Sequence, residues 1–410
     1  MAVGIESINA YVGRASLGVR ELFQARGLQM QRFDNLMMER KSVNLPCEDP
    51  VSNAVNAAKP LIDELAQADR DRIQLVIVGT ESGLDFGKPV STYIHDYLGL
   101  TPRCRSFEVK HACYGGTAAL QTAAAIVAAS PEESAKALVI ATDAASAAAR
   151  NSYWEPSQGA GAVAMLVGRN PAVLELDEGA NGFYSHEVMD TLRPRPDLEA
   201  GDTDLSLLSY LNCLEQSFRG YCERVDGADL MTSFSYLVLH TPFAGMVRGA
   251  HRKLLRSVAG LGPEAIAADF SARVRHCLHY CSDVGNVYSA ALYLALCSLI
   301  DHVQFTGEER IGLFSYGSGC ASEFYSGVVT SRAGQVLARH GIAAAIADRY
   351  PLRMDEYEVL SDMSLDRMAG IQDHQYEVTA YEAVYKNHFD GRGLLVLDKI
   401  DNFHRVYRWT

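Results

Sequence analysis

The chain has 410 residues, of which 48% are hydrophobic and 21% are charged, so it can bury a large core and is neither disordered nor fibrous. Its 37 basic and 50 acidic residues give a net charge of −13, and no basic block is present. This balance argues against nucleic acid or a membrane surface as a partner.

The N-terminal residues contain no basic region followed by an apolar core, because Glu6 interrupts the first apolar run. We therefore expect no secretion signal and a cytoplasmic protein. The nine cysteines have no regular spacing and are odd in number, which predicts free thiols rather than a disulfide framework.

Short runs rich in Val, Ile and Leu alternate along the chain with longer Ala-rich segments, which is typical of an α/β protein. The segments 116–129 and 287–300 are apolar on nearly all sides, so we expect two helices in the middle of the protein, each too short to span a bilayer. We expect strands at 74–78, 137–141, 161–167, 236–239, 311–316 and 393–398.

The same order of parts occurs twice. A strand ending near Glu81 precedes Cys113 and its apolar helix, and a strand ending at His240 precedes Asn286 and its apolar helix. An approximate two-fold would bring these four side chains to one cleft. We expect an N-terminal half, a connecting insertion with an Arg-Pro-Arg-Pro turn at Arg193, and a C-terminal half, at residues 1–170, 171–230 and 231–410.

Cys113 directly precedes two glycines and a predicted buried helix. A helix N-terminus lowers the pKa of a thiol, so the position favours a nucleophilic thiolate. The alternative is a small buried cysteine, as we expect for the other eight. His240 and Glu81 follow predicted strands, where catalytic groups often lie. Their alternatives are a histidine bonded to the backbone and an ordinary ion-pair partner.

Two further motifs require interpretation. Residues 276–281 (HCLHYC) hold four possible zinc ligands, but they lack a Cys-x-x-Cys knuckle and a second matched cluster, so we expect no metal. Gly317, Ser318 and Gly319 follow a predicted strand without the Lys of a phosphate-binding loop. We expect this turn to present backbone amides to a carbonyl.

Taken together, these motifs resemble the 3-hydroxy-3-methylglutaryl-CoA (HMG-CoA) synthase family of thiolase-fold condensing enzymes. The blocks that carry the resemblance run in family order through most of the chain. They are residues 35–38 (NLMM), 79–82 (GTES), 112–120 (ACYGGTAAL), 159–166 (GAGAVAML), 240–243 (HTPF), 284–288 (VGNVY) and 314–320 (FSYGSGC).

The resemblance implies a five-layered αβαβα fold of two similar halves, usually dimeric, and a three-stage reaction. Cys113 would accept an acetyl group, and Glu81 would deprotonate its methyl so that the enolate attacks the β-ketone of a second thioester. His240 would hold the acceptor carbonyls, and water would release the product. The residues implied to bind substrate are Asn286, Tyr316, Gly317 and Ser318, with backbone amides near Cys113 and Ser318 around the oxyanion.

Residues 32–38 and 48–58 are most similar to the branch that installs β-branches in polyketides. The resemblance implies no bound cofactor, and partners that are a donor acetyl-acyl carrier protein (ACP) and an acceptor β-ketoacyl-ACP, each presenting a phosphopantetheine arm. The sequence departs from primary-metabolism members, which commonly carry Asn where His111 stands and Lys near Gly245. The missing lysine argues against conventional binding of coenzyme A phosphates.

Three other functions remain open. A primary-metabolism HMG-CoA synthase would use acetyl-CoA and acetoacetyl-CoA. A ketoacyl synthase of the same fold would generate its carbanion by decarboxylation, and Glu81 argues against it because that route needs no strong base. A non-catalytic partner subunit would lack the reactive groups, yet Cys113, Glu81 and His240 are all present.

A basic helix face follows His240. The stretch 246–258 predicts a helix without acidic residues, and its basic positions recur every four residues, which places them on one face. The alternative is an ordinary solvated face. We expect these residues to dock an acidic carrier protein: Arg248, Arg252, Lys253 and Arg256.

Overall fold

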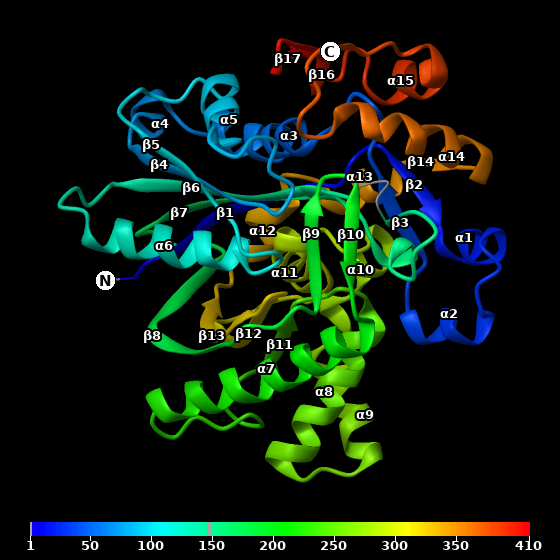
Figure 1. The fold of residues 1–410 in the computed structure, drawn as a ribbon. Helices are drawn as coiled ribbons and strands as arrows, with labels where there is room; N and C mark the ends of the chain where they lie inside the picture. The colour runs from blue at the N-terminus through cyan, green and yellow to red at the C-terminus, as the bar shows by residue number, and fades with distance from the viewer. Residues whose placement is uncertain (1, 146–148) are drawn as a thin grey trace.

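The computed structural model describes residues 2–145 and 149–410. Figure 1 shows a mixed sheet with helices on both sides of it. The sheet has nine strands in the order β11 (Tyr236–Leu239), β12 (Glu309–Gly317), β13 (Ala321–Val329), β8 (Leu174–Ser185), β1 (Gly4–Tyr11), β7 (Ala160–Gly168), β6 (Lys136–Ala144), β4 (Ile73–Gly79) and β5 (Arg105–Val109).

The sheet contains the expected repeat. In one half β4 runs parallel to β6, β6 antiparallel to β7, and β7 antiparallel to β1. In the other half β11, β12, β13 and β8 pair in the same senses. The halves join where β1 pairs with β8, and among the described strands β5 has no counterpart in the second half. The α/β class and the two similar halves are confirmed.

Five layers follow from the alternation of side chains along the strands. Leu75 and Ile77 of β4 face the middle layer, whereas Val76 and Val78 face the outer layer, as the period of two requires. The middle layer holds α6 (Gly115–Ala129) and α11 (Ala291–His302). The outer layers hold α3 (Pro50–Asp63) and α5 (Ser91–Tyr97) on one side, and α7 (Thr203–Arg224), α8 (Ala244–Ala259) and α9 (Pro263–Arg273) on the other.

The two central helices differ in burial. Residues 291–300 of α11 are all buried, as expected, but only one face of α6 is covered. Helix α6, on the left of Figure 1, lies in the middle layer as expected, but the expectation that it is covered on all sides is wrong. By length and composition, segment 112–129 is the one candidate membrane span in the described residues; 44% of it is buried, where α6 packs on β4 and β6.

Residues 171–230, predicted as a connecting insertion, contribute a strand and a helix to the second half of the fold. Strand β8 pairs with β13, so it belongs to the second half of the sheet. Helix α7 covers that half through a stripe at helical spacing, and the stripe was missed because the segment reads as polar. The stripe consists of Tyr210, Cys213, Leu214, Ser217, Phe218 and Tyr221.

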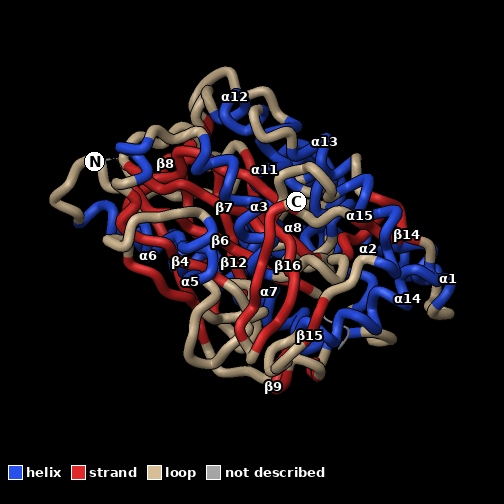
Figure 2. The backbone as a smooth tube through the Cα atoms, turned by 90° about the horizontal axis from the view of Figure 1, so that it is seen from above, coloured by secondary structure: helices blue, strands red, loops and turns tan. Residues whose placement is uncertain are grey.

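The strand expected at 393–398 is β16 (Leu395–Asp401), in a separate sheet with β15 (His374–Gln375) and β17 (His404–Trp409). Figure 2, seen from above, shows β16 lying over the molecule. The remaining sheets are β14 (Tyr350–Leu352) with β2 (Ala15–Gly18) and β3 (Arg40–Val43), and the hairpin β9 (Thr191–Arg195) and β10 (Leu198–Gly201).

The other helices are short. They are α1 (Val19–Ala25), α2 (Met30–Leu36), α4 (Gln67–Arg70), α10 (His279–Val284), α12 (Ala333–Ala338), α13 (Ile342–Ala347), α14 (Met354–Met363) and α15 (Glu382–His388).

Candidate active site

A cavity of about 790 Å³ opens where the two halves meet. Its wall includes Cys113, Glu81, His240 and Asn286, so the structure brings together the four side chains that the repeat predicts. The first two come from the N-terminal half and the other two from the C-terminal half. A cavity of this size accepts an extended acyl group.

Cys113 lies between β5 and α6. Its neighbour Ala112 has a φ of +40°, and the helix begins after Tyr114. A side-chain carbon at Gly116 would lie 2.3 Å from the backbone oxygen of Ser289. Only glycine therefore lets the start of α6 approach the second half this closely, and that approach closes the site around Cys113.

The expected low pKa of Cys113 is wrong for the free protein. Burial, together with the nearby carboxylates of Glu81 and Asp143, holds the pKa of this thiol well above its ordinary value. Arg193 and a hydrogen bond with the Asn286 side chain oppose this rise. Cys113 is therefore a protonated thiol before it meets a thioester.

Glu81 follows β4 and is fixed through its own backbone. Its amide donates to Asp143 Oδ1 over 2.9 Å, and Asp143 lies at the end of β6 with no exposed surface. The same carboxylate accepts hydrogen bonds from Thr80, Ser82 and Ser289. Asp143 thus joins the segment that carries Glu81 to the other half of the protein.

The carboxyl of Glu81 titrates far from its ordinary range. Burial raises its pKa to about 8, Arg193 opposes the rise, and Asp143 and Glu199 add to it. The Arg193 guanidinium lies 3.7 Å from Glu81 Oε1 and 3.4 Å from Glu199 Oε2. A carboxylate with a pKa near 8 is a stronger base than an ordinary glutamate.

His240 and Asn286 form the facing wall. His240 is 1% exposed, and burial lowers its pKa to about 3, so its imidazole is neutral. Its carbonyl accepts the hydroxyl of Tyr210 over 2.7 Å. Asn286 Oδ1 accepts the amide of Tyr288 over 2.9 Å, which fixes the side chain beside Cys113. A neutral histidine and an amide suit carbonyl binding.

The turn after β12 has a divided role. Tyr316 and Ser318 line the cavity, whereas Gly317 does not line it among the described residues. A side-chain carbon at Gly317 would lie 2.5 Å from the carbonyl oxygen of His111, so this glycine lets the turn pack against the Cys113 segment. The amide of Gly319 donates to Asp190 over 2.9 Å, and Tyr316 donates to the same carboxylate.

Several residues of the site were given no site role from the sequence. His111 lines the cavity, its Nε2 is buried without a hydrogen-bond partner in the described chain, and burial lowers its pKa. Asp143 and Asp190 anchor the catalytic segments, and Arg193 and Glu199 line the cavity. Asp143 follows a predicted strand, which was a usable signal, but the others depend on long-range packing.

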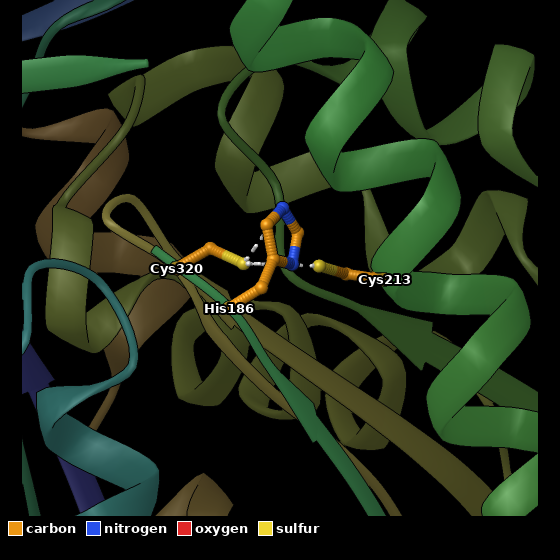
Figure 3. A group of neighbouring side chains, drawn as sticks. All are labelled: His186, Cys213 and Cys320. Carbon is orange, nitrogen blue, oxygen red and sulfur yellow. Dashed lines mark hydrogen bonds between the residues drawn. The ribbon is translucent and has the colours of Figure 1, made fainter. Parts of the chain in front are cut away.

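A His and two Cys side chains form the single group of possible metal ligands in the described residues (Figure 3). Cys320 Sγ lies 3.4 Å from Cys213 Sγ, and 3.1 Å and 3.8 Å from the two ring nitrogens of His186. If Cys320 Sγ lay along the lone-pair direction of one imidazole nitrogen of His186, its distance to the other ring nitrogen would be much longer than the one found. The sulfur therefore lies along neither lone-pair direction. The group lies next to the turn that carries Ser318, because Cys320 follows that turn directly. That the protein functions without a metal stays a prediction.

The cysteines of the motif 276–281 point to backbone oxygens. Cys277 Sγ donates to the carbonyl of Leu237 and Cys281 Sγ to that of Ala291. His279 instead stacks on His302, with ring centroids 4.2 Å apart. These side chains act in packing.

The basic face of α8 is exposed along its length, at Arg248, Arg252, Lys253 and Arg256. Phe243 and Met246, at the start of the same helix, line the cavity. The helix therefore runs from the mouth of the site outward. This placement is the one that the docking hypothesis requires.

Known proteins resemble the chain along its whole length. The sequence profile described as Hydroxymethylglutaryl-coenzyme A synthase N terminal matches residues 1–172, and the corresponding C terminal profile matches residues 262–409. The chain is 50% identical over 418 residues to the polyketide biosynthesis 3-hydroxy-3-methylglutaryl-ACP synthase PksG of Bacillus subtilis, covering 100% of this chain and 99% of that protein.

Two further similarities bracket this one. The hydroxymethylglutaryl-CoA synthase of Enterococcus faecalis is 35% identical over 369 residues, covering 89% of this chain and 93% of that protein. The crystal structure of the curacin biosynthetic pathway HMG synthase in complex with acetyl donor-ACP superposes with a TM-score of 0.97 at 52% identity, covering 100% of both chains.

Proposed function

We propose, because this chain belongs to the hydroxymethylglutaryl-coenzyme A synthase family, that it joins an acetyl group to the β-ketone of an acyl chain on an acyl carrier protein. The product is a 3-hydroxy-3-carboxymethyl acyl thioester, as polyketide β-branching requires. The observation that carries the proposal is the meeting of Cys113, Glu81, His240 and Asn286 in one cavity.

The reaction begins at Cys113. The thiol attacks the donor thioester, the acetyl group moves to Cys113, and the thiol proton leaves with the departing carrier thiol. Glu81 then removes a proton from the acetyl methyl, and the enolate carbon attacks the β-ketone. Glu81 returns that proton to the new alkoxide. His240 and Asn286 hold the acceptor carbonyls, and water releases the product from Cys113.

Three observations support carrier proteins as the source of both acyl groups. PksG is named a synthase of an ACP-bound product, and the curacin pathway enzyme is known with its acetyl donor-ACP. In addition, a side-chain carbon at Gly245 would lie 1.7 Å from the backbone oxygen of Asn35 in α2. A lysine for coenzyme A phosphates has no room there unless α2 moves.

Acetylation tests this function directly. Mixing the protein with acetyl-ACP should add about 42 daltons to Cys113, the mass of acetyl replacing hydrogen. Acetyl-CoA in a parallel reaction should react more slowly, and equal rates would favour the primary-metabolism enzyme. Release of carbon dioxide from a malonyl thioester would favour a ketoacyl synthase, and no adduct would favour a non-catalytic subunit.

The carrier protein docks, in this proposal, on the exposed basic face of α8. Reversing Arg248 and Arg252 to Glu should slow acetyl transfer from ACP by an order of magnitude at low salt, because steering by charge raises the association rate. Arg103 and Arg339 are exposed elsewhere, and their reversal to Glu is the matched control. An unchanged rate in the α8 variant would exclude this face.

We also propose a homodimer, in which a second copy covers two surfaces that are open in the single chain. Strand β5 is the last strand of the nine-stranded sheet and has no strand partner on its other side among the described residues. Beside it, the outer face of α6 includes the exposed Ala125 and Ala129 and the half-buried Ala118 and Thr122. A second copy would cover both. Ala125→Arg should then produce monomers in sedimentation velocity, and a wild-type monomer would contradict the proposal.

A further inference from the structure

We propose that the β9–β10 hairpin takes part in the chemistry through two positioning residues: Arg193 supports the ionised form of Glu81, and Glu199 limits that support by sharing the guanidinium. The sequence identified Arg193 only as part of a turn in a connecting segment. This inference rests on the proposed role of Glu81 as the base, and it assigns the residues that control that base.

The hairpin brings both residues into the cavity. Arg193 lies on β9 and Glu199 on β10, and the two strands pair from Thr191 opposite Gly201. The guanidinium of Arg193 lies 3.7 Å from Glu81 and 3.4 Å from Glu199. The side chains of Arg193 and Glu81 are each 18% exposed and that of Glu199 is 5% exposed, so water screens these charges little.

The position of Arg193 leaves its charge available to Glu81. The guanidinium carbon lies 5.5 Å from the ring centre of Tyr288, and the Nε atom is buried without a hydrogen-bond partner in the described chain. Glu199 is held from its other side, because Gln158 Nε2 donates to its Oε1 over 3.0 Å. Glu199 is therefore held in place, and the guanidinium of Arg193 is shared between the carboxylates of Glu81 and Glu199.

In the part of the chain that the structure describes, five charged or titratable groups act on Glu81 from the elements packed around it. They are Asp143 on β6, Arg193 on β9, Glu199 on β10, Cys113 before α6, and Tyr288 after Asn286. Asp143 and Glu199 favour the protonated form of Glu81, and Arg193 favours the carboxylate. Burial also favours protonation, so Arg193 keeps Glu81 able to act as a base near neutral pH.

Opposite effects of two substitutions follow from this arrangement. In Arg193→Gln the carboxylate loses the cation that lies 3.7 Å from it, so Glu81 should ionise at higher pH. In Glu199→Gln a repelling charge disappears and Arg193 is no longer shared, so Glu81 should ionise at lower pH. A purely structural hairpin would lose activity in both variants without moving the titration in opposite directions.

The experiment follows exchange of the acetyl-enzyme methyl hydrogens in D₂O, read by mass spectrometry as a function of pH. The exchange midpoint should rise by about 1 pH unit in Arg193→Gln and fall by about 1 in Glu199→Gln, as a charge within a few ångströms predicts. Arg193→Lys should restore part of the loss. Arg195→Gln and Asp197→Asn, exposed on the same hairpin at 65% and 52%, are the matched controls and should not shift it.

A second readout separates this inference from the proposed function. Alkylation of Cys113 by iodoacetamide requires no acetyl donor, and Arg193→Gln should slow it because Arg193 lowers the pKa of that thiol. Absence of acetylation in the wild type would defeat the proposed function while alkylation still tests the hairpin. Midpoints that stay fixed, or that move in the same direction in Arg193→Gln and Glu199→Gln, would overturn the inference. If Arg193→Gln does not fold, Glu199→Gln must still lower the midpoint.

Discussion

Asp143→Asn is the substitution that tests the architecture of the site most directly. Oδ1 of Asp143 accepts from Thr80 Oγ1, the Glu81 amide, and both the amide and hydroxyl of Ser82, at 2.8–3.0 Å. Oδ2 accepts from the amide and hydroxyl of Ser289, at 3.0 and 2.5 Å. Six donors therefore converge on a carboxylate without exposed surface.

The expected loss of stability comes from the Oδ2 side. Asparagine keeps one oxygen for the donors around Oδ1, and the hydroxyl of Ser289 can turn to accept from the new amide. The backbone amide of Ser289 then faces an NH₂ group and loses its acceptor, at a cost of about 1–3 kcal/mol. The hydrogen bonds that remain are also weaker, because they are made to a neutral amide instead of a carboxylate. We therefore expect the free energy of unfolding to fall by about 2–4 kcal/mol in total, which lowers Tm by about 2–5 °C in a chain of this length.

The assay for Asp143→Asn combines calorimetry with two chemical rates. Acetyl-methyl exchange should slow because the segment holding Glu81 is less fixed, whereas alkylation of Cys113 should quicken because a negative charge near the thiol is gone. Ser134→Ala, at a site outside the cavity, controls for a generic substitution. Slower alkylation with an unchanged Tm would refute the role given to Asp143.

Four further outcomes are expected. Cys113→Ser should give no acetyl adduct by mass spectrometry, because a hydroxyl is a far weaker nucleophile than a thiol. Glu81→Gln should keep acetylation and lose condensation. The pKa of Glu81 is about 8 in the folded protein and about 4.3 in the unfolded chain, so the free energy of unfolding of the wild type falls as pH rises between these values. Relative to the wild type, the free energy of unfolding of the variant should therefore increase by about 2–4 kcal/mol between pH 5 and pH 9, as measured by denaturant titration. Asp49→Ala should cost about 3–5 kcal/mol of unfolding free energy, because it leaves the buried Arg405 guanidinium, now 2.9 Å away, unpaired. Gly245→Lys should lower Tm without raising the rate with acetyl-CoA, and a gain with acetyl-CoA would contradict the steric argument.

The sequence predicted the parts of the fold that depend on local pattern. Strands β4, β6, β7, β11 and β12 fall where runs of buried Val, Ile and Leu predict them. Burial that depends on a second surface was not predictable in this way. Helix α6 is apolar all round, yet one of its faces is uncovered in a single chain. Helix α7 was missed because its apolar stripe is interleaved with polar positions.

The candidate site divides in the same manner. Cys113, Glu81, His240 and Asn286 were identified because each lies at a strand end or a helix start, where position in the sequence fixes position in the fold. Arg193 was not, since it reaches Glu81 only through the pairing of β9 with β10. The pKa of Cys113 was predicted with the wrong sign, because the helix start is visible in the sequence and the nearby carboxylates are not.

The raised pKa of Cys113 bears on the order of the reaction steps. Cys113 and Glu81 each raise the pKa of the other group when ionised, so the free site resists holding both negative charges at once. The thiolate that attacks the donor thioester therefore forms more readily while Glu81 is protonated, because an ionised Glu81 raises the pKa of Cys113. Acetylation removes the titratable proton of Cys113 and with it any thiolate charge beside Glu81. Once Cys113 carries the acetyl group it can no longer become a thiolate, and Glu81 can ionise and act as the base without a second negative charge forming beside it.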